Sequence, residues 1–291
     1  MGRTKYNRPD YKDGVGGFDP SYHYEMVSDQ ERVGQIKKAL ACTLTPDMTF
    51  CELGCGTGIF SLHAAKTVKK VYAVEYDKAT AEFAKKNFGK SPFKDKIELI
   101  EANALEVVLP EKVDVIFAEM LSTALIHEPQ VPVINHMRQF LKPNGFIIPY
   151  RIVNIAELVN VDFVFDDVEI RTCFYEFTGI KKPRLMSLSH NYFTADFVKK
   201  VPMEVKHTYK TAALIDGIIN AVRLTSIVCL AEGVNFYSTD SLMPPVIIPL
   251  KNDVDANWGD TLKVKLNYKH MTDLNKVTAE VIPICSRNLF G

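Results

Sequence analysis

Short, almost wholly apolar runs alternate with amphipathic stretches from residue 50 to residue 149. Runs of this kind are typical of strands in a parallel sheet whose two faces are both covered by helices. They predict strands over 50–53, 71–75, 97–101, 113–118 and 146–149. The stretches between them predict helices over 59–70, 78–88 and 129–141, with a turn at 142–145. The alternation predicts an α/β fold with a Rossmann-like, doubly wound domain that binds its ligands at the carboxyl ends of the strands.

The pattern is different on either side of this region. Five later segments are rich in valine and isoleucine and have no helical period: 152–165, 197–208, 218–230, 261–268 and 276–283. They predict a β-rich second domain, a barrel or a sandwich. Upstream, Ser28-Asp29-Gln30-Glu31 has the order of a capping box that starts a helix. Residues 1–20, rich in glycine, tyrosine and charged residues, are expected to be mobile.

The composition narrows the functional classes. Lysine plus arginine and aspartate plus glutamate both number 35, so no overall basic charge favours nucleic acid. No apolar run is long enough to span a membrane, and the N-terminus has no signal-peptide core. The six cysteines show no C-x-x-C spacing and no paired histidines, which predicts no metal site and favours a reducing cytoplasm.

A glycine-rich turn follows the first predicted strand. In Glu52-Leu53-Gly54-Cys55-Gly56-Thr57-Gly58, the glycines allow a sharp turn from strand to helix and a close approach of a ligand to the backbone. The spacing G-x-G-x-G lacks the third glycine of the dinucleotide pattern G-x-G-x-x-G. Glu75 ends the second predicted strand, where an acid can accept both hydroxyls of a ribose. The two features together predict a nucleoside-containing cofactor.

Further motifs, from about Tyr24 to Glu157, resemble those of the protein arginine methyltransferases. These enzymes use S-adenosylmethionine (SAM) and carry a β-barrel behind a Rossmann-like cofactor domain. The motifs are the helix segment 25–32, the glycine loop 52–58, Val74-Glu75, the strand entry 109–114, and the closing segment 141–149. The most specific motif is Ala118-Glu119-Met120 followed by Glu128, which has the spacing of the family's two catalytic glutamates. The resemblance is only topological after Glu157.

The resemblance implies SAM as the cofactor, with S-adenosylhomocysteine as the product. Arg32 would clamp the cofactor's carboxylate, supported by Asp29, and Met26 would lie against its sulfur end. Asn103 and Ala104 would read the adenine edge. The full cofactor set is Met26, Arg32, Glu52, Gly54, Gly56, Gly58, Glu75, Asn103, Ala104 and Glu119.

Glu119 and Glu128 are the predicted catalytic residues. A guanidinium is planar, carries five donors and stays protonated in proteins, so carboxylates can fix its plane and draw charge toward its far nitrogens. The resemblance therefore implies a protein N-methyltransferase with arginine as the leading acceptor. His127, beside Glu128, can reach the acceptor or be an ordinary loop residue.

One departure from the family concerns the acceptor. The family carries a Thr-His-Trp loop in its barrel, and the corresponding segment 241–249 has neither histidine nor tryptophan. Trp258, His207 and His270 lie outside this motif and are expected to be structural. The alternatives are therefore a SAM-dependent enzyme acting on RNA, on another side chain such as histidine or on a small molecule, and a non-catalytic module that binds SAM.

The predicted organisation has three parts. Residues 1–27 form a mobile lid that orders when the cofactor binds, 28–149 form the SAM-binding domain, and 150–291 form the barrel-like domain. Aromatic residues in 174–180 and 191–193 favour a homodimer interface or packing back onto the barrel. A protein substrate is favoured over RNA, and no membrane partner is expected.

Overall fold

The computed structural model describes residues 20–284, with side chains from His23 onward. The chain divides into two compact units. The first unit holds the described residues as far as Phe117 together with Gln139–Phe146, and the second holds Ala118–Arg138 and the described residues from Ile147. The predicted 28–149 domain differs from this division at residues 147–149 and in the segment Ala118–Arg138, which carries both predicted catalytic glutamates. Residues 1–19 of the predicted lid lie outside the described residues.

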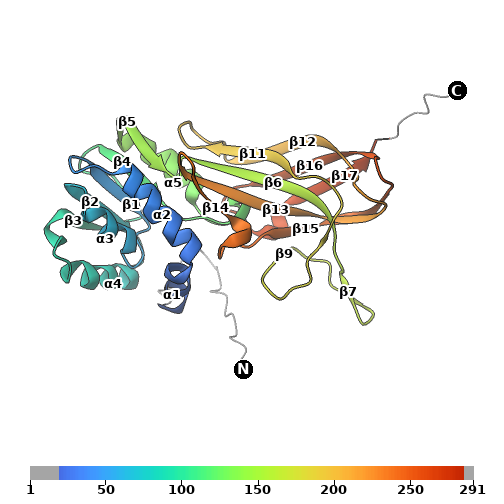
Figure 1. Ribbon diagram of the computed structural model, residues 1–291, viewed down its shortest axis with the longest axis horizontal. Coiled ribbons are helices and arrows are strands. Elements are labelled where there is room, and N and C mark those ends of the chain that lie inside the picture. Colours follow the sequence, from blue (N-terminus) through green and yellow to red (C-terminus); the bar gives the residue numbers. More distant parts are fainter. Residues whose placement is uncertain (1–19, 285–291) are drawn as a thin grey trace. The chain divides into compact units, whose positions relative to one another are not determined.

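A five-stranded sheet forms the first unit, in the order β3-β2-β1-β4-β5 (Figure 1). Its strands are β1 (Thr49–Leu53), β2 (Lys70–Glu75), β3 (Ile97–Glu101), β4 (Val113–Ala118) and β5 (Leu141–Ile148). The pairs β1–β2 and β2–β3 are parallel, and all five residues of β1 are buried. The strand order reverses at β1, which creates a switch point beside the glycine loop. The predicted Rossmann-like fold is confirmed.

Two helices precede this sheet where the sequence predicted one. They are α1 (Pro20–Ser28) and α2 (Gln30–Thr43), and the capping residue between them is Asp29 rather than Ser28. The Asp29 carboxylate accepts the Arg32 N–H at 3.1 Å, while Ser28 belongs to the end of α1. The capping-box prediction was therefore wrong by one residue.

The helices α3 (Ile59–Ala65) and α4 (Lys78–Gly89) follow β1 and β2. The predicted helix 59–70 ends early because the N–H groups of Thr67 and Val68 both turn back to the carbonyl of Ala64. The Lys69 N–H then donates to the Met48 carbonyl, and β2 begins at the next residue, Lys70.

Strand β5 replaces the turn predicted at 142–145. Lys142 pairs with Asp114 of β4 at 2.8 Å, and Asp114 also accepts the Thr49 N–H at 2.7 Å. A Cβ at Gly145 would lie 2.8 Å from the carbonyl oxygen of Asp114, so only glycine allows this close approach. The helix predicted over 129–141 is shorter in the structure: α5 spans Gln130–Met137, and a 3₁₀ turn, Arg138–Phe140, leads into β5.

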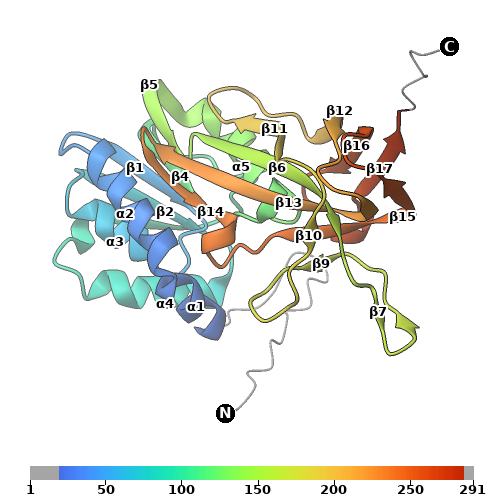
Figure 2. The same cartoon turned by 45° about the vertical axis from the view of Figure 1, so that its right-hand side comes forward.

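The second unit is built from antiparallel sheets, as Figure 2 shows from another side. The larger sheet has the order β10-β6-β13-β15-β9, with β11 beside β6 and β14 beside β13. Its strands are β6 (Arg151–Asn160), β9 (Phe174–Tyr175), β10 (Arg184–Leu185), β11 (His190–Asp196), β13 (Gly217–Ala231), β14 (Val234–Tyr237) and β15 (Val246–Ala256). A second sheet contains β12 (Glu204–Ala212), β16 (Thr261–Lys269) and β17 (Thr278–Pro283).

Both of these sheets contribute to one hydrophobic core in the second unit. Leu158 of β6, Leu224 of β13 and Leu266 of β16 are all fully buried in it. The predicted barrel-like domain is confirmed. A small hairpin, β7 (Val164–Phe165) and β8 (Val168–Glu169), exposes its apolar side chains.

The aromatic residues expected to form an interface separate into two groups. Tyr192 is buried, and its hydroxyl lies 2.9 Å from that of Tyr268. Phe193 packs against the core, whereas Phe177 is 40% exposed. No helix among the described residues is long and apolar enough to cross a membrane.

Candidate active site

The glycine loop between β1 and α3 adopts a backbone conformation that favours glycine. Gly54, Gly56 and Gly58 have φ values of 67°, 55° and 85°, all in the left-handed region. A Cβ at Gly58 would lie 2.3 Å from the Phe88 ring, which is packed in a buried cluster. The loop therefore turns tightly and presents its backbone at the carboxyl end of β1.

Glu75 fixes this loop from the end of β2. Its carboxylate accepts the Gly56 N–H at 2.9 Å through one oxygen and the N–H groups of Tyr76 and Asp77, at 2.9 and 3.0 Å, through the other. A carboxylate has about four acceptor positions, so the group keeps capacity for a ribose hydroxyl. Glu75 and Gly56 are thus brought together as the cofactor interpretation requires.

Arg32 and Met26 are also neighbours. Arg32 Nη1 donates to Met26 Sδ at 3.2 Å, and Arg32 is only 6% exposed. His23 of α1 lies over the glycine loop, since a Cβ at Gly56 would be 3.2 Å from its ring. The first unit therefore places an imidazole over the loop and holds a buried cation against a thioether in the same pair of helices.

Glu52, Asn103 and Ala104 occupy more enclosed positions. Glu52 is 2% exposed and accepts a short hydrogen bond from the Ser61 hydroxyl. Asn103 uses its side-chain oxygen to accept the Leu105 N–H at 3.0 Å, which shapes the turn after β3. Ala104 is buried in that turn. These contacts explain how the three residues are held, and their cofactor roles stay a proposal.

The two predicted catalytic glutamates lie at opposite ends of one loop in the second unit. Ser122 Oγ accepts the N–H groups of His127 and Glu128, at 3.0 and 3.3 Å, and so closes the loop on itself. The buried Gln130 side chain accepts the Met120 N–H and donates to the carbonyl of Ala118, at 3.0 and 2.9 Å. These bonds tie the backbone on both sides of Glu119 to the start of α5.

The middle of this loop has an uncommon backbone. Ala124 and Leu125 have φ values of 61° and 57°, which non-glycine residues seldom adopt. Residues from β13, β16 and the turn after it hold this shape through four hydrogen bonds. Ser226 Oγ accepts the Ala124 N–H at 2.8 Å, the Tyr268 hydroxyl donates to the Ala124 carbonyl at 2.9 Å, His270 Nδ1 contacts the Leu125 carbonyl at 2.8 Å, and Thr272 donates to Ile126 at 2.9 Å.

Strained backbone of this kind persists only where the surroundings over-determine it, and it is concentrated at functional sites. We call Ser226, Tyr268 and His270 the loop brace. Sequence reasoning missed the brace because its members lie about a hundred residues or more from the loop. His270 was expected to be structural, and the fully buried ring does support the fold through this contact.

The brace predicts a pH dependence of stability. Burial lowers the pKa of His270 below its ordinary 6.5, although the bond to Leu125 opposes the shift. The unfolded chain then binds a proton more readily than the folded chain, so the free energy of unfolding is retained above pH 6.5 and falls as the pH drops below it. We expect denaturation midpoints at pH 5.5 to be lower than at pH 7.5.

His270→Gln is the matched variant for this prediction. Glutamine can still donate to Leu125 but has no proton to gain, so the loss of stability between pH 7.5 and 5.5 should be smaller than in the native chain. Burial also lowers the pKa values of His63, His190 and His207. These three residues therefore preserve part of the pH dependence of stability in both the native chain and the variant. Identical pH slopes for the two proteins would show that His270 does not titrate with unfolding.

Comparisons with known proteins agree with this architecture. Residues 50–145 match a methyltransferase domain family. An uncharacterized protein of Methanocaldococcus jannaschii is 33% identical over 89% of this chain and 95% of its own length. Another, from Methanothermobacter thermautotrophicus, is 30% identical over 90% of this chain and 97% of its own length. Protein arginine N-methyltransferase 6 of Danio rerio is 34% identical, but the match covers 46% of this chain and 39% of that protein.

Solved structures extend the likeness over both units. The Trypanosoma brucei PRMT1 enzyme-prozyme complex with AdoHcy has a TM-score of 0.75 at 17% identity, over 91% of this chain and 98% of the matched chain. Protein arginine methyltransferase 10 of Arabidopsis thaliana has a TM-score of 0.74 at 16% identity, over 91% of this chain and 98% of the matched chain. Identity at this level shows the fold, a Rossmann-like domain followed by a barrel-like domain.

The fold, the glycine loop with Glu75 and the domain match define a SAM-dependent methyltransferase. Within that class, the chain belongs to the same family as the two archaeal proteins, a family of methyltransferases resembling the protein arginine methyltransferases.

Proposed function

We propose that this enzyme transfers a methyl group from SAM to a guanidinium nitrogen of an arginine side chain in a protein. The observation that carries the proposal is the braced loop, which holds Glu119 and Glu128 on one strained and hydrogen-bonded segment. A pair of solvated loop acids would not need such support. The spacing of the two glutamates supports the same interpretation.

The chemistry requires carboxylates at these positions. A guanidinium delocalises its charge, and its nitrogens are poor nucleophiles while the charge is shared equally. Two carboxylates fix the plane and draw the charge toward the far nitrogens, so that electron density is left at the reacting nitrogen. SAM supplies an electrophilic methyl group on a sulfonium. In the proposed transfer, the nitrogen–carbon bond would form as the carbon–sulfur bond breaks, the electron pair would go to sulfur, and the methylated guanidinium would release one proton to solvent.

The cofactor would be held by the first unit. Glu75 keeps acceptor capacity for the ribose beside the Gly56 backbone, and Arg32 offers a buried cation for the carboxylate. Met26, in contact with Arg32, supplies a thioether for the sulfur end. Gly54 and Gly58 leave the turn without side chains. Glu52, Asn103, Ala104 and Glu119 complete the proposed cofactor set.

The decisive experiment is labelling with a radioactive methyl donor. The purified protein is incubated with labelled SAM and either a native protein lysate or total RNA, and the modified species is hydrolysed and identified. Label on methylarginine supports the proposal. Label on histidine, on an RNA base or on a small molecule would assign one of the alternatives, and no transfer by a protein that binds SAM would indicate a binding module.

Glu75 gives a separate test of the cofactor site. Glu75→Ala should weaken S-adenosylhomocysteine binding by about 10- to 150-fold, the ~1.5–3 kcal/mol of a hydrogen bond to a charged group. Calorimetry measures this loss directly. Glu98→Ala, in the Lys70–Glu98 pair of the same sheet, is the control and should leave the dissociation constant unchanged. Equal affinities for both variants would contradict a ribose contact at Glu75.

The proposal also covers the domain organisation and the assembly of the chain. Residues 1–27 are proposed as the lid, 28–149 as the SAM-binding domain and 150–291 as the acceptor domain. A homodimer is proposed because Phe177, Val164 and Phe165 are 40%, 60% and 57% exposed, and light scattering at micromolar concentration tests it. A cytoplasmic location stays a prediction from the cysteine pattern.

A further inference from the structure

A short strand covers the segment where the resembling family carries its Thr-His-Trp loop. Tyr175 and Phe174 of β9 pair with Val246 and Ile247 at the start of β15. The Glu176 N–H continues this pairing by donating to the Pro245 carbonyl at 2.8 Å. The segment Phe174–Phe177, which we call the cover segment, therefore lies along the part of the barrel that lacks the family's histidine and tryptophan.

The cover segment brings aromatic rings to the side of Glu128. The ring centroids of Tyr175 and His127 are 6.1 Å apart, with the planes tilted by 42°. Phe177 extends the row, with its centroid 5.8 Å from that of Tyr175. His127 is adjacent in sequence to Glu128, and Ser122 holds the N–H groups of both. Tyr175 thus belongs to the surroundings of a predicted catalytic glutamate, which sequence spacing alone did not show.

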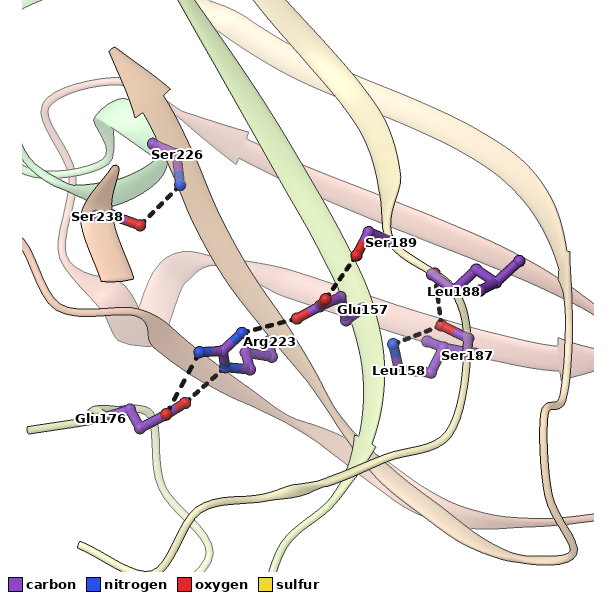
Figure 3. A network of polar contacts seen from close by, with 9 residues as sticks. All are labelled: Glu157, Leu158, Glu176, Ser187, Leu188, Ser189, Arg223, Ser226 and Ser238. Carbon is purple, nitrogen blue, oxygen red and sulfur yellow. Dashed lines mark hydrogen bonds and ion pairs between the residues drawn. The ribbon is translucent and has the colours of Figure 1, made fainter. Parts of the chain in front are cut away.

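A buried ion-pair network fixes the cover segment (Figure 3). Arg223 of β13 donates to both carboxylate oxygens of Glu176, at 2.6 and 3.3 Å, and to Glu157 of β6 at 2.8 Å. Glu157 also accepts the Ser189 hydroxyl at 2.6 Å. The side chains of Arg223, Glu157 and Glu176 are only 16%, 11% and 7% exposed.

Two opposing effects act on Arg223. Burial alone would lower the pKa of Arg223, but the hydrogen bonds that it donates to Glu176 and Glu157 outweigh this effect and raise the pKa above its ordinary value. A charge held in this way, with two-pronged geometry, positions its partner rigidly. The network therefore fixes Glu176, and with it the backbone of the neighbouring Tyr175.

The chemistry of the acceptor explains why an aromatic ring is useful here. Carboxylates bind the edges of a guanidinium, whereas its flat faces are best covered by an aromatic ring, which attracts the cation. We propose that Tyr175 is the aromatic wall of the acceptor site, on which the guanidinium face stacks, and that the Glu176–Arg223 pair is its positioning device. This inference rests on the proposed function, since it takes arginine as the acceptor.

The test measures peptide binding, so it does not depend on turnover. An arginine-containing peptide carrying a fluorescent label is titrated with the full chain in the presence of S-adenosylhomocysteine. Tyr175→Leu should weaken peptide binding about tenfold, the loss expected of one partly desolvated cation–ring contact, with affinity for S-adenosylhomocysteine unchanged. Tyr175→Phe, which keeps the ring, should bind within about twofold of the native protein. Trp258→Leu removes an exposed ring elsewhere in the same unit and should change nothing.

The positioning role has its own signature. Glu176→Gln should weaken peptide binding, and the double variant Tyr175→Leu with Glu176→Gln should bind no more weakly than Tyr175→Leu alone. If Glu176 only stabilised the fold, Glu176→Gln would lower the melting temperature. Its loss of peptide affinity would then add to the loss caused by Tyr175→Leu. Additive losses would overturn the positioning role of the pair.

The outcomes separate the two proposals. If the native enzyme binds and methylates arginine peptides but Tyr175→Leu binds them as well as the native protein does, the aromatic wall is wrong and the proposed function stands. If the native enzyme neither binds nor methylates arginine peptides, and label from SAM goes to another acceptor, the proposed function is wrong and the inference fails with it.

Discussion

Glu128→Gln should lower the turnover number for methyl transfer by about 10²- to 10³-fold, the loss typical when one electrostatic contact to the reacting centre is removed. The substitution keeps the volume of the side chain and removes its charge, so the guanidinium loses one of the two carboxylates that fix its plane and polarise it. Rapid-quench measurements with saturating SAM and an arginine peptide give this number directly.

The same variant should keep its cofactor affinity. Glu128 is not among the predicted cofactor contacts, so the dissociation constant of S-adenosylhomocysteine should stay within about twofold, far below the change expected from losing a charged hydrogen bond. Glu232→Gln, at an exposed turn in the same unit, is the matched control and should have native turnover. A Glu128→Gln enzyme that keeps more than half of the native rate would exclude a catalytic role for this carboxylate.

Gly58→Ala should be the most destabilising small substitution in the glycine loop. The added Cβ would lie 2.3 Å from the buried Phe88 ring, and the residue would keep a φ of 85°. Left-handed backbone costs about 1–2 kcal/mol and overpacking costs about 1–3 kcal/mol, so a loss of about 2–5 kcal/mol is expected. Calorimetric melting of the native and variant chains measures it.

A second glycine provides the opposite control. Gly34 is exposed in the middle of α2, and a Cβ there would meet nothing within 4 Å. Gly34→Ala should therefore raise the free energy of unfolding by about 0.5–1 kcal/mol, since glycine weakens a helix. If the two substitutions changed the melting temperature equally, the close packing of Gly58 on Phe88 would be wrong.

The sequence predicts the first unit well for a physical reason. Strands β1 and β4 are almost completely buried, so they appear as continuous apolar runs whose bounds can be read directly. Strand β5 was missed in part because Lys142, Asn144 and Gly145 have the composition of a turn, while their conformation is set by Asp114 of the neighbouring strand. A contact between distant residues leaves no local pattern.

The candidate site shows the same limit. Gly56, Glu75, Glu119 and Glu128 could be named because a motif with fixed spacing carries them. The loop brace and the Arg223 network could not, because each joins residues that are separated along the chain and of common types. Strand β15 was also missed, since Lys251, Asn252 and Asp253 interrupt its apolar pattern at an exposed stretch.

The loop brace has a consequence for how such enzymes diverge. The shape of the segment between Glu119 and Glu128 depends on Ser226, Tyr268 and His270, and none of these belongs to the cover segment. If Tyr175 is the aromatic wall proposed above, substitutions in the cover segment would change which acceptor is admitted while the brace contacts of the glutamate loop are kept. On the proposed roles, selectivity and reactivity would depend on different residues, so a lineage could alter its substrate in small mutational steps while keeping the contacts that hold the glutamate loop.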